Sequence, residues 1–160
     1  MEYIYIGDIV NTHGIKGEIR ILSNFKYKNL VFKPNFKIYI GKEKTQEIIS
    51  SYRQHKNYDM ICLNSYNNIN QVLKYKGKPV YINRLDLNVP YLNSDLINFT
   101  VYNKNKEIGK LTNVREIKDK EFLVINNKIL IPNIDRFVKK IDLNNKKIII
   151  ETIKGMLDED

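Results

Sequence analysis

Residues 4–22 read IYIGDIVNTHGIKGEIRIL, two apolar-rich runs on either side of a short loop. Ile, Val and Tyr favour strands, and the second run, from Glu18 to Leu22, alternates polar with apolar residues. The loop contains Gly14 and Gly17, and glycine permits the positive φ angles that tight turns need. This stretch therefore predicts two strands joined by a turn.

The β pattern continues through the first 85 residues with one interruption. Further strands are predicted at 36–40, 47–53, 58–63 and 79–82. One short helix is predicted between Asn68, a good N-cap, and Gly77, with Pro79 preventing its continuation. Several short strands with one helix before the last of them indicate a small β-barrel.

The second half of the chain shows three hairpins and almost no helical signal. The turns are predicted at 103–106, 126–128 and 142–145, each between two apolar runs. Residues 86–94 include Pro90 and lack periodicity, which indicates a linker. We therefore expect an all-β protein of two small β-barrels, at 1–85 and 95–160.

Positive charge is concentrated in the first barrel. The 160 residues include 27 Lys and Arg against 18 Asp and Glu, a formal net charge of +9. Residues 1–85 hold 14 basic and 6 acidic side chains, a net of +8, whereas residues 86–160 hold 13 and 12, a net of +1. This asymmetry predicts that the first barrel meets a polyanion such as nucleic acid.

The sequence lacks the usual patterns of a catalytic or metal site. Cys62 is the only cysteine, so neither an internal disulfide nor a thiolate zinc site can form. His13 and His55 are the only histidines, and HExxH, GxSxG and phosphate-loop patterns are absent. No apolar run approaches the roughly 20 residues of a membrane helix. We expect a cytoplasmic protein that is not an enzyme, although the fold could still bring two carboxylates together.

An ordered set of motifs resembles the RimM family of ribosome maturation factors. The first is Ile6–Val10 followed by His13–Ile21, a strand, a His-Gly-x-x-Gly-Glu loop and a second strand. The remaining motifs are similar to the PRC-barrel domain of that family and follow in its order: Asp95-Leu96-Ile97, Ile108–Leu111, Leu130-Ile131-Pro132, Val138–Leu143, Lys147–Ile150 and Lys154–Leu157.

The resemblance implies a six-stranded N-terminal barrel like those of translation factors, joined to a C-terminal PRC β-barrel. It implies an assembly chaperone for late maturation of the small-subunit head and 16S rRNA processing. The partners would be 16S rRNA and the nineteenth small-subunit ribosomal protein, the latter bound by the PRC barrel. We expect a monomer with no cofactor, small-molecule substrate or membrane contact. A general RNA-binding translation factor, or an rRNA-modifying enzyme or its subunit, remains an alternative.

Two groups of residues are candidate binding sites. His13, Gly14, Lys16, Gly17 and Arg20 are candidates for contact with RNA or the ribosome, since a glycine loop can present amides and a lysine to phosphate. The same loop could equally be a tight barrel corner. Candidates for contact with the ribosomal protein are Tyr91, Asp95, Arg136, Lys139 and Lys140.

Two positions depart from the pattern of the family. Leu92 follows Tyr91 where relatives often carry an aromatic pair, so this surface should be less aromatic. Asn98 replaces the usual glycine after Asp-Leu-Ile, and Asn tolerates left-handed geometry better than most residues. Between residues 25 and 44, lysines alternate with aromatic residues; we expect most of these rings in the core and the lysines in solvent.

Overall fold

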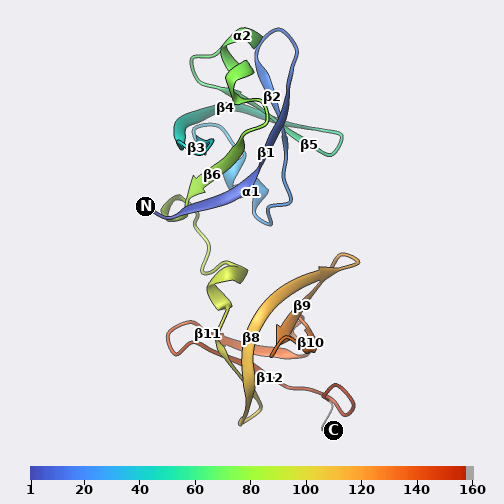
Figure 1. Ribbon diagram of the computed structural model, residues 1–160. Helices are drawn as coiled ribbons and strands as arrows, with labels where there is room; N and C mark the ends of the chain where they lie inside the picture. Colours follow the sequence, from blue (N-terminus) through green and yellow to red (C-terminus); the bar gives the residue numbers. More distant parts are fainter. Residues whose placement is uncertain (158–160) are drawn as a thin grey trace. The chain divides into compact units, whose positions relative to one another are not determined.

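The computed structural model describes residues 1–157, which separate into two compact units, residues 1–88 and 89–157 (Figure 1). Strands dominate both units, which confirms the predicted all-β class. The predicted linker at 86–94 stays a prediction. Two short 3-10 helices overlap its ends, η2 (Arg84–Asp86) and η3 (Asn93–Leu96).

The first unit is a closed barrel of six antiparallel strands, as the family resemblance implied. Its strands follow one another around the barrel in the order β1-β2-β5-β4-β3-β6. Their bounds are β1 Tyr3–His13, β2 Glu18–Leu22, β3 Lys37–Ile40, β4 Thr45–His55, β5 Tyr58–Leu63 and β6 Pro79–Asn83.

The barrel closes because β1 pairs with two different strands. Its first half, Tyr3 to Asp8, pairs with β6, and its second half, Asp8 to His13, pairs with β2. A register shift in each ladder bends the strand between its partners. Gly7 lies at the first shift, where an added Cβ would be 2.7 Å from the Leu22 carbonyl oxygen. The close approach of β1 to β2 therefore needs a residue without a side chain.

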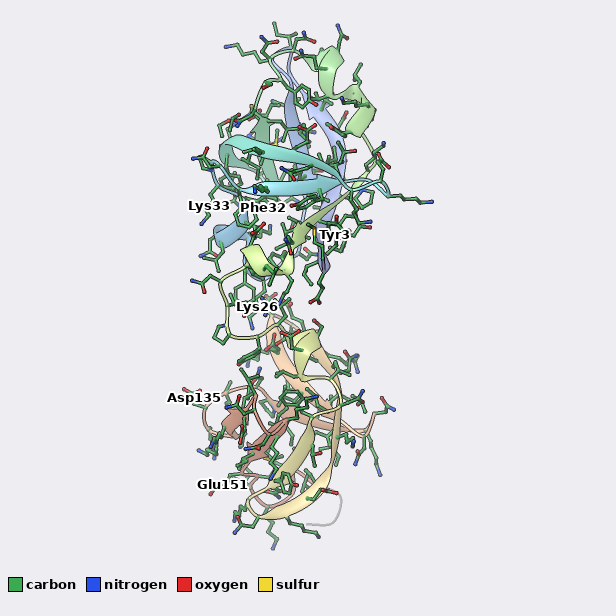
Figure 2. The ribbon with its side chains drawn as sticks, turned by 90° about the vertical axis from the view of Figure 1, so that its left-hand side faces the viewer. Tyr3, Lys26, Phe32, Lys33, Asp135 and Glu151 are labelled. Atoms are coloured by element: carbon green, nitrogen blue, oxygen red, sulfur yellow. The ribbon has the colours of Figure 1, made fainter. Side chains whose placement is uncertain are left out.

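Alternating apolar residues fill the barrel interior. The fully buried set consists mostly of isoleucines, and these include Ile6, Ile9, Ile19, Ile21, Ile38, Ile40, Ile49, Ile61 and Ile82. Phe32, Phe36 and Tyr39 are also buried, so most rings of residues 25–44 are shielded from solvent, as predicted. Tyr39 lies between the fully buried Ile38 and Ile40 and therefore points to the outer side of the barrel. Phe32 lies against the barrel, while its neighbour Lys33 is exposed (Figure 2).

The predicted helix is present and begins as expected. α2 (Ile69–Val72) starts after Asn68, whose side chain accepts a hydrogen bond from Asn70 N, and continues as η1 (Leu73–Tyr75). Gly77 then adopts a positive φ of 80° before β6 begins. A second single turn, α1 (Lys28–Val31), was not anticipated; it has neither a side-chain cap nor an acidic residue in its first turn, so no local signal marks it.

The second unit is a six-stranded sheet in the order β10-β9-β8-β7-β12-β11, with β10 and β11 at its edges. All three predicted hairpins are present. β8 runs farther than expected and forms a further hairpin with β9 through Lys118 and Asp119. The bounds are β7 Thr100–Asn103, β8 Lys106–Ile117, β9 Lys120–Ile125, β10 Ile129–Pro132, β11 Val138–Asp142 and β12 Lys147–Ile150.

A parallel pairing between β7 and β12 joins the β10-β9-β8-β7 part of the sheet to the β12-β11 hairpin. The pairing runs from Lys147 opposite Thr100 to Ile150 opposite Asn103. Leu96 of η3, Val101 and Ile148 lie at the centre of the core. Asn98 adopts a φ of 72°, which confirms that Asn accepts the geometry normally left to glycine here.

The β1–β2 turn offers a matched test of its two glycines. Both have positive φ, 74° at Gly14 and 88° at Gly17, so alanine at either costs about 1–2 kcal/mol. A Cβ at Gly17 would also lie 2.9 Å from the Asn68 carbonyl oxygen, whereas none of the described atoms lies within 4 Å of one at Gly14. Urea unfolding should show Gly17→Ala losing about 1–3 kcal/mol more than Gly14→Ala. Equal losses would mean that the turn does not pack on α2 this tightly.

Candidate functional site

A cluster of basic and imidazole side chains forms at one end of the barrel. The β1–β2 turn and the β4–β5 turn meet there, because β2 and β4 both pair with β5. The His13 and His55 ring centroids, one from each turn, are 5.8 Å apart. We call this cluster the basic end, and its residues are His13, Lys16, Arg20, Arg53, His55 and Lys56.

Arg20 is held in place by two aromatic neighbours. Its Nη2 lies 2.8 Å from His13 Nδ1, and its guanidinium carbon lies 5.0 Å from the centre of the Tyr58 ring. A guanidinium over a ring keeps its charge and its hydrogen-bond donors while the side chain loses freedom. The structure therefore brings two of the predicted site residues, His13 and Arg20, into direct contact.

Arg53 forms a two-bonded ion pair with Glu18, the only carboxylate in contact with this cluster among the described residues. Its Nη2 and Nε donate to the two Glu18 carboxylate oxygens at 2.6 and 2.8 Å. These bonds lower the pKa of the Glu18 carboxyl below its usual range. Glu18 thus offsets one guanidinium, and the basic end keeps a net positive charge from Lys16, Arg20 and Lys56.

His55 responds to the positive potential of the cluster. Burial lowers the pKa of its imidazole, and the charges of Arg53 and Lys56 lower it further. The positive charges of Lys16, Arg20 and Lys56 attract anions. The basic end is therefore suited to phosphate.

The loop between β1 and β2 has a structural role and an exposed tip. The Ile15 carbonyl oxygen accepts a hydrogen bond of 2.9 Å from Ile69 N, which fixes the loop to the start of α2. Together with the positive φ angles, this contact accounts for Gly14 and Gly17 by turn geometry. Gly14, Ile15 and Lys16 are exposed at the tip, and Lys16 is the one that carries a charge for a ligand.

Sequence reasoning did not find Arg53, His55 and Tyr58 as parts of this site. Arg53 and Arg20 both pair in register with Met60, from opposite sides of β5. No local motif reveals this, because Glu18 and Arg53 are 35 residues apart in the chain. A correct pairing of the β4–β5 hairpin with β2 was the signal that could have placed them.

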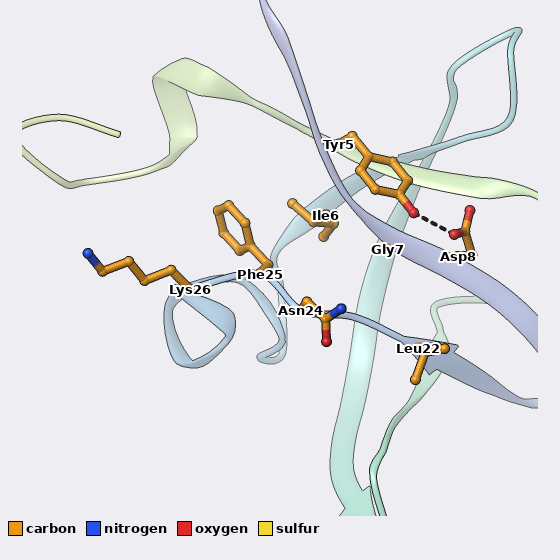
Figure 3. A pocket seen from close by; sticks show the side chains of 8 residues that line it. All are labelled: Tyr5, Ile6, Gly7, Asp8, Leu22, Asn24, Phe25 and Lys26. Carbon is orange, nitrogen blue, oxygen red and sulfur yellow. Dashed lines mark hydrogen bonds between the residues drawn. The ribbon is translucent and has the colours of Figure 1, made fainter. Parts of the chain in front are cut away.

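A small pocket lies elsewhere on the barrel, between the first half of β1 and the segment after β2 (Figure 3). Its volume is about 360 Å³, and its lining includes Tyr5, Asp8, Asn24, Phe25 and Lys26. The Tyr5 hydroxyl donates a hydrogen bond to the Asp8 carboxylate, and this bond raises the pKa of Tyr5 to about 12. The phenol therefore stays protonated and its ring is fixed at the pocket wall.

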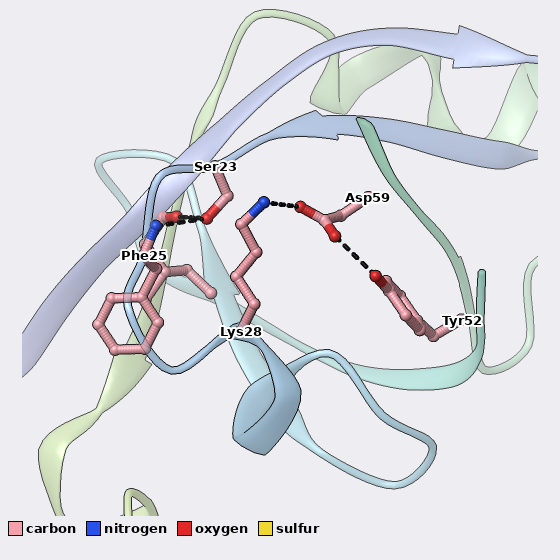
Figure 4. Close-up of polar contacts among 6 residues, drawn as sticks. Ser23, Phe25, Lys28, Tyr52 and Asp59 are labelled. Atoms are coloured by element: carbon pink, nitrogen blue, oxygen red, sulfur yellow. Dashed lines mark hydrogen bonds and ion pairs between the residues drawn. The ribbon is translucent and has the colours of Figure 1, made fainter. Parts of the chain in front are cut away.

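A buried carboxylate braces the barrel near α1. Asp59 accepts a hydrogen bond of 2.7 Å from the Tyr52 hydroxyl and lies 2.9 Å from Lys28 Nζ (Figure 4). Burial and this hydrogen bond raise the pKa of Tyr52 to about 12. Because Lys28 matches the charge of Asp59 and Tyr52 donates a hydrogen bond to it, we assign this group to stability and not to binding.

Tyr91 and Asp95 lie at η3 in the second unit. Tyr91 is half-buried against the core of the unit, and Leu92 beside it is buried. The Asp95 carboxylate accepts a hydrogen bond of 2.7 Å from Leu92 N, so this residue stabilises the turn of its own segment. The surface here presents one partly exposed ring.

Arg136, Lys139 and Lys140 lie on and beside the edge strand β11. A register shift between Val138 and Lys140 leaves Lys139 as an extra residue, so both lysines are exposed instead of alternating. The guanidinium carbon of Arg136 lies 5.2 Å from the centre of the Phe137 ring, and Phe137 is buried. Three exposed cations therefore gather along this edge.

Within residues 1–157, no group of three or more His, Cys, Asp or Glu side chains has the geometry to hold a metal ion. The helices of the described chain are too short and too polar to cross a membrane.

The chain is similar to known proteins along nearly all of its length. Residues 4–87 match the family described as RimM N-terminal domain, and residues 93–156 match RimM PRC barrel domain. Relatives named ribosome maturation factor RimM, from Staphylococcus haemolyticus (strain JCSC1435) and Staphylococcus aureus (strain bovine RF122 / ET3-1), are each 36% identical and cover 97% of this chain and 99% of their own. The solution structure of the N-terminal domain of RimM from Thermus thermophilus covers 57% of this chain and 100% of its own, at 16% identity and a TM-score of 0.48.

The Glu18–Arg53 pair predicts a pH-dependent contribution to stability. Because the pKa of Glu18 is lowered in the folded state, its contribution is present above the usual carboxyl pKa of 4.5 and is lost as pH falls through the folded value. Arg53→Gln should therefore lower the free energy of unfolding at neutral pH, and this loss should shrink in acid. Lys16→Gln removes the same charge nearby and serves as the control. Urea unfolding across this range, with NMR titration of Glu18, measures both; a loss that does not vary with pH would contradict the pairing.

Proposed function

The chain belongs to the RimM family, and from this we propose that it is a non-enzymatic factor for maturation of the small ribosomal subunit. The observation that carries the proposal is the match to both domains of the family, in order, along nearly the whole chain. The proposed partners are 16S rRNA and the nineteenth small-subunit ribosomal protein, met late in assembly of the subunit head.

The proposed rRNA contact is the basic end of the first barrel. Three features support it: the net charge of +8 in residues 1–85, the exposed Lys16, and the guanidinium of Arg20 held between His13 and Tyr58. Phosphate contacts of this kind supply affinity without reading sequence. Gly14 and Gly17 contribute by shaping the turn.

The proposed contact with the ribosomal protein is the edge of the second unit at Arg136, Lys139 and Lys140, with Tyr91 and Asp95 at η3. An edge strand carrying exposed cations favours a charged partner and resists pairing with another copy of itself. We therefore propose that the protein acts as a monomer.

As an assembly chaperone, the protein would bind an immature head more tightly than a mature one. A ligand shifts a folding equilibrium by its preference for one state, so no cofactor or bond-making step is required. The protein would leave when mature contacts replace its own. This role places it in the bacterial cytoplasm.

Sedimentation of cell extract on a sucrose gradient tests this function. The tagged chain should travel with free small subunits and be absent from whole ribosomes. Migration with whole ribosomes would favour a general translation factor. Absence from every ribosomal fraction at low salt would overturn the proposal, and methyl transfer to rRNA by the purified chain would favour a modifying enzyme.

The basic end predicts a change in salt dependence. Lys16→Ala should weaken rRNA binding and lower the slope of log affinity against log salt by about 0.7–0.9, because one phosphate contact is lost. Lys110→Ala removes the same charge from the second unit and should leave the slope unchanged. Fluorescence anisotropy across a salt series measures both. An unchanged slope in folded Lys16→Ala would return the β1–β2 loop to a purely structural role.

Charge reversal tests the edge of the second unit. Lys139→Glu with Lys140→Glu should weaken binding of the purified nineteenth small-subunit protein about tenfold or more, because the proposed contacts of both cations would be lost and their charges reversed. Lys110→Glu, on β8 with β7 and β12 between it and β11, is the control. Isothermal titration calorimetry reports the affinity, and equal affinities for all variants would exclude this edge as the contact.

A further inference from the structure

Four tyrosines form a row across three neighbouring strands of the barrel. Tyr5 of β1 pairs in register with Tyr81 of β6, and Tyr81 pairs with Tyr39 of β3. Tyr3 lies two residues before Tyr5 and so points to the same face. Ile82, next to Tyr81, is fully buried, which places the tyrosines on the outer side. We call Tyr3, Tyr5, Tyr39 and Tyr81 the tyrosine face.

The rings of the tyrosine face support one another. Tyr3 lies 5.2 Å from Tyr39 and 6.4 Å from Tyr81, and Tyr5 lies 6.0 Å from Tyr81, all edge to face. Tyr39 is 5% exposed, whereas Tyr3 is 37% and Tyr5 is 53% exposed. Two inner rings thus hold two outer rings in place, and the outer rings remain open to solvent.

Cations border the exposed rings. Lys44 Nζ lies 4.1 Å from the centre of the Tyr81 ring and 5.4 Å from that of Tyr3. On the other side, Tyr5 forms one wall of the pocket that also contains Phe25 and Lys26 (Figure 3). The Asp8 carboxylate near Tyr5 accepts a hydrogen bond from the hydroxyl of that ring.

We propose that the tyrosine face binds an unpaired segment of RNA, with bases stacked on Tyr3 and Tyr5 and one base in the pocket beside Tyr5. Lys44 and Lys26 would meet the phosphates on either side. The proposal rests on the RNA-binding role proposed for the first barrel and adds a preference for single-stranded RNA.

The chemistry of the face favours RNA over a protein partner. Exposed rings bordered by ammonium groups suit bases and phosphates together, and every base has a flat face that can stack. The barrel that carries the face has a net charge of +8 over residues 1–85. Packing between strands accounts for Tyr39, but it does not require Tyr5 to keep more than half of its surface exposed.

The experiment compares ring removal with ring retention in the full chain. Tyr3→Ser and Tyr5→Ser leave net charge unchanged and lie at exposed positions, and circular dichroism checks that the variants fold. Each should weaken binding of a single-stranded oligoribonucleotide about tenfold. Tyr3→Phe and Tyr5→Phe keep the ring and should bind as the unchanged chain does. Binding to a duplex of equal length should change little in any variant.

Stacking has its own signal. An oligoribonucleotide carrying 2-aminopurine loses emission when that base stacks on a ring, so emission should fall on binding to the unchanged chain. With the Ser variants, the emission of 2-aminopurine should stay near that of the free oligoribonucleotide. Since the chain has 11 tyrosines and no tryptophan, quenching of tyrosine emission provides a second reading.

The outcomes separate this proposal from the function on which it rests. If the Ser variants bind single-stranded RNA as tightly as the unchanged chain while Lys16→Ala binds more weakly, the tyrosine face is not an RNA site. The proposal for the basic end then stands. If the Ser variants keep their RNA affinity but no longer sediment with small subunits, the tyrosine face contacts a protein instead, and the proposal is overturned. If the Ser variants lose RNA affinity and Lys16→Ala does not, the result supports the tyrosine face as the RNA site and excludes the basic end. No RNA binding by the unchanged chain overturns both.

Discussion

Closure of the first barrel depends on one strand serving two partners. β1 gives its first half to β6 and its second half to β2, and it must bend between them. The bend is possible because Gly7 leaves room for the Leu22 carbonyl oxygen, where a methyl group would overlap it. Both surfaces to which we assign RNA contact follow from this strand: the tyrosine face lies on its first half, and His13 ends its second half at the basic end.

The two halves of β1 carry different chemistry because the environments of their ends differ. At the β1–β2 turn the chain packs against the start of α2, so the glycines are fixed by geometry and the neighbouring charges remain for a ligand. On the first half, in-register tyrosines replace the polar residues usual on an outer sheet face. One contact would be set by charge and the other by stacking, and these two respond differently to salt.

Most of the fold could be predicted from local patterns, and most of the site could not. The hairpin turns at 103–106, 126–128 and 142–145 are polar segments between apolar runs, and Asn68 marks its helix, so neighbouring residues suffice. The order of strands around the barrel and the parallel β7–β12 pair depend on residues far apart in the chain, which no local pattern encodes. The same applies to the site: His13 and Arg20 share one hairpin, but Arg53 and His55 arrive from another.

The parallel pairing of β7 with β12 has a consequence for synthesis of the chain. The first barrel has all its strands once β6, which ends at Asn83, has emerged from the ribosome. The second sheet stays incomplete until β12, at Lys147–Ile150, has followed, because β12 lies between β7 and β11. The nascent chain therefore acquires a finished first barrel while the other sheet still lacks an interior strand, and the two units fold in sequence as separate events.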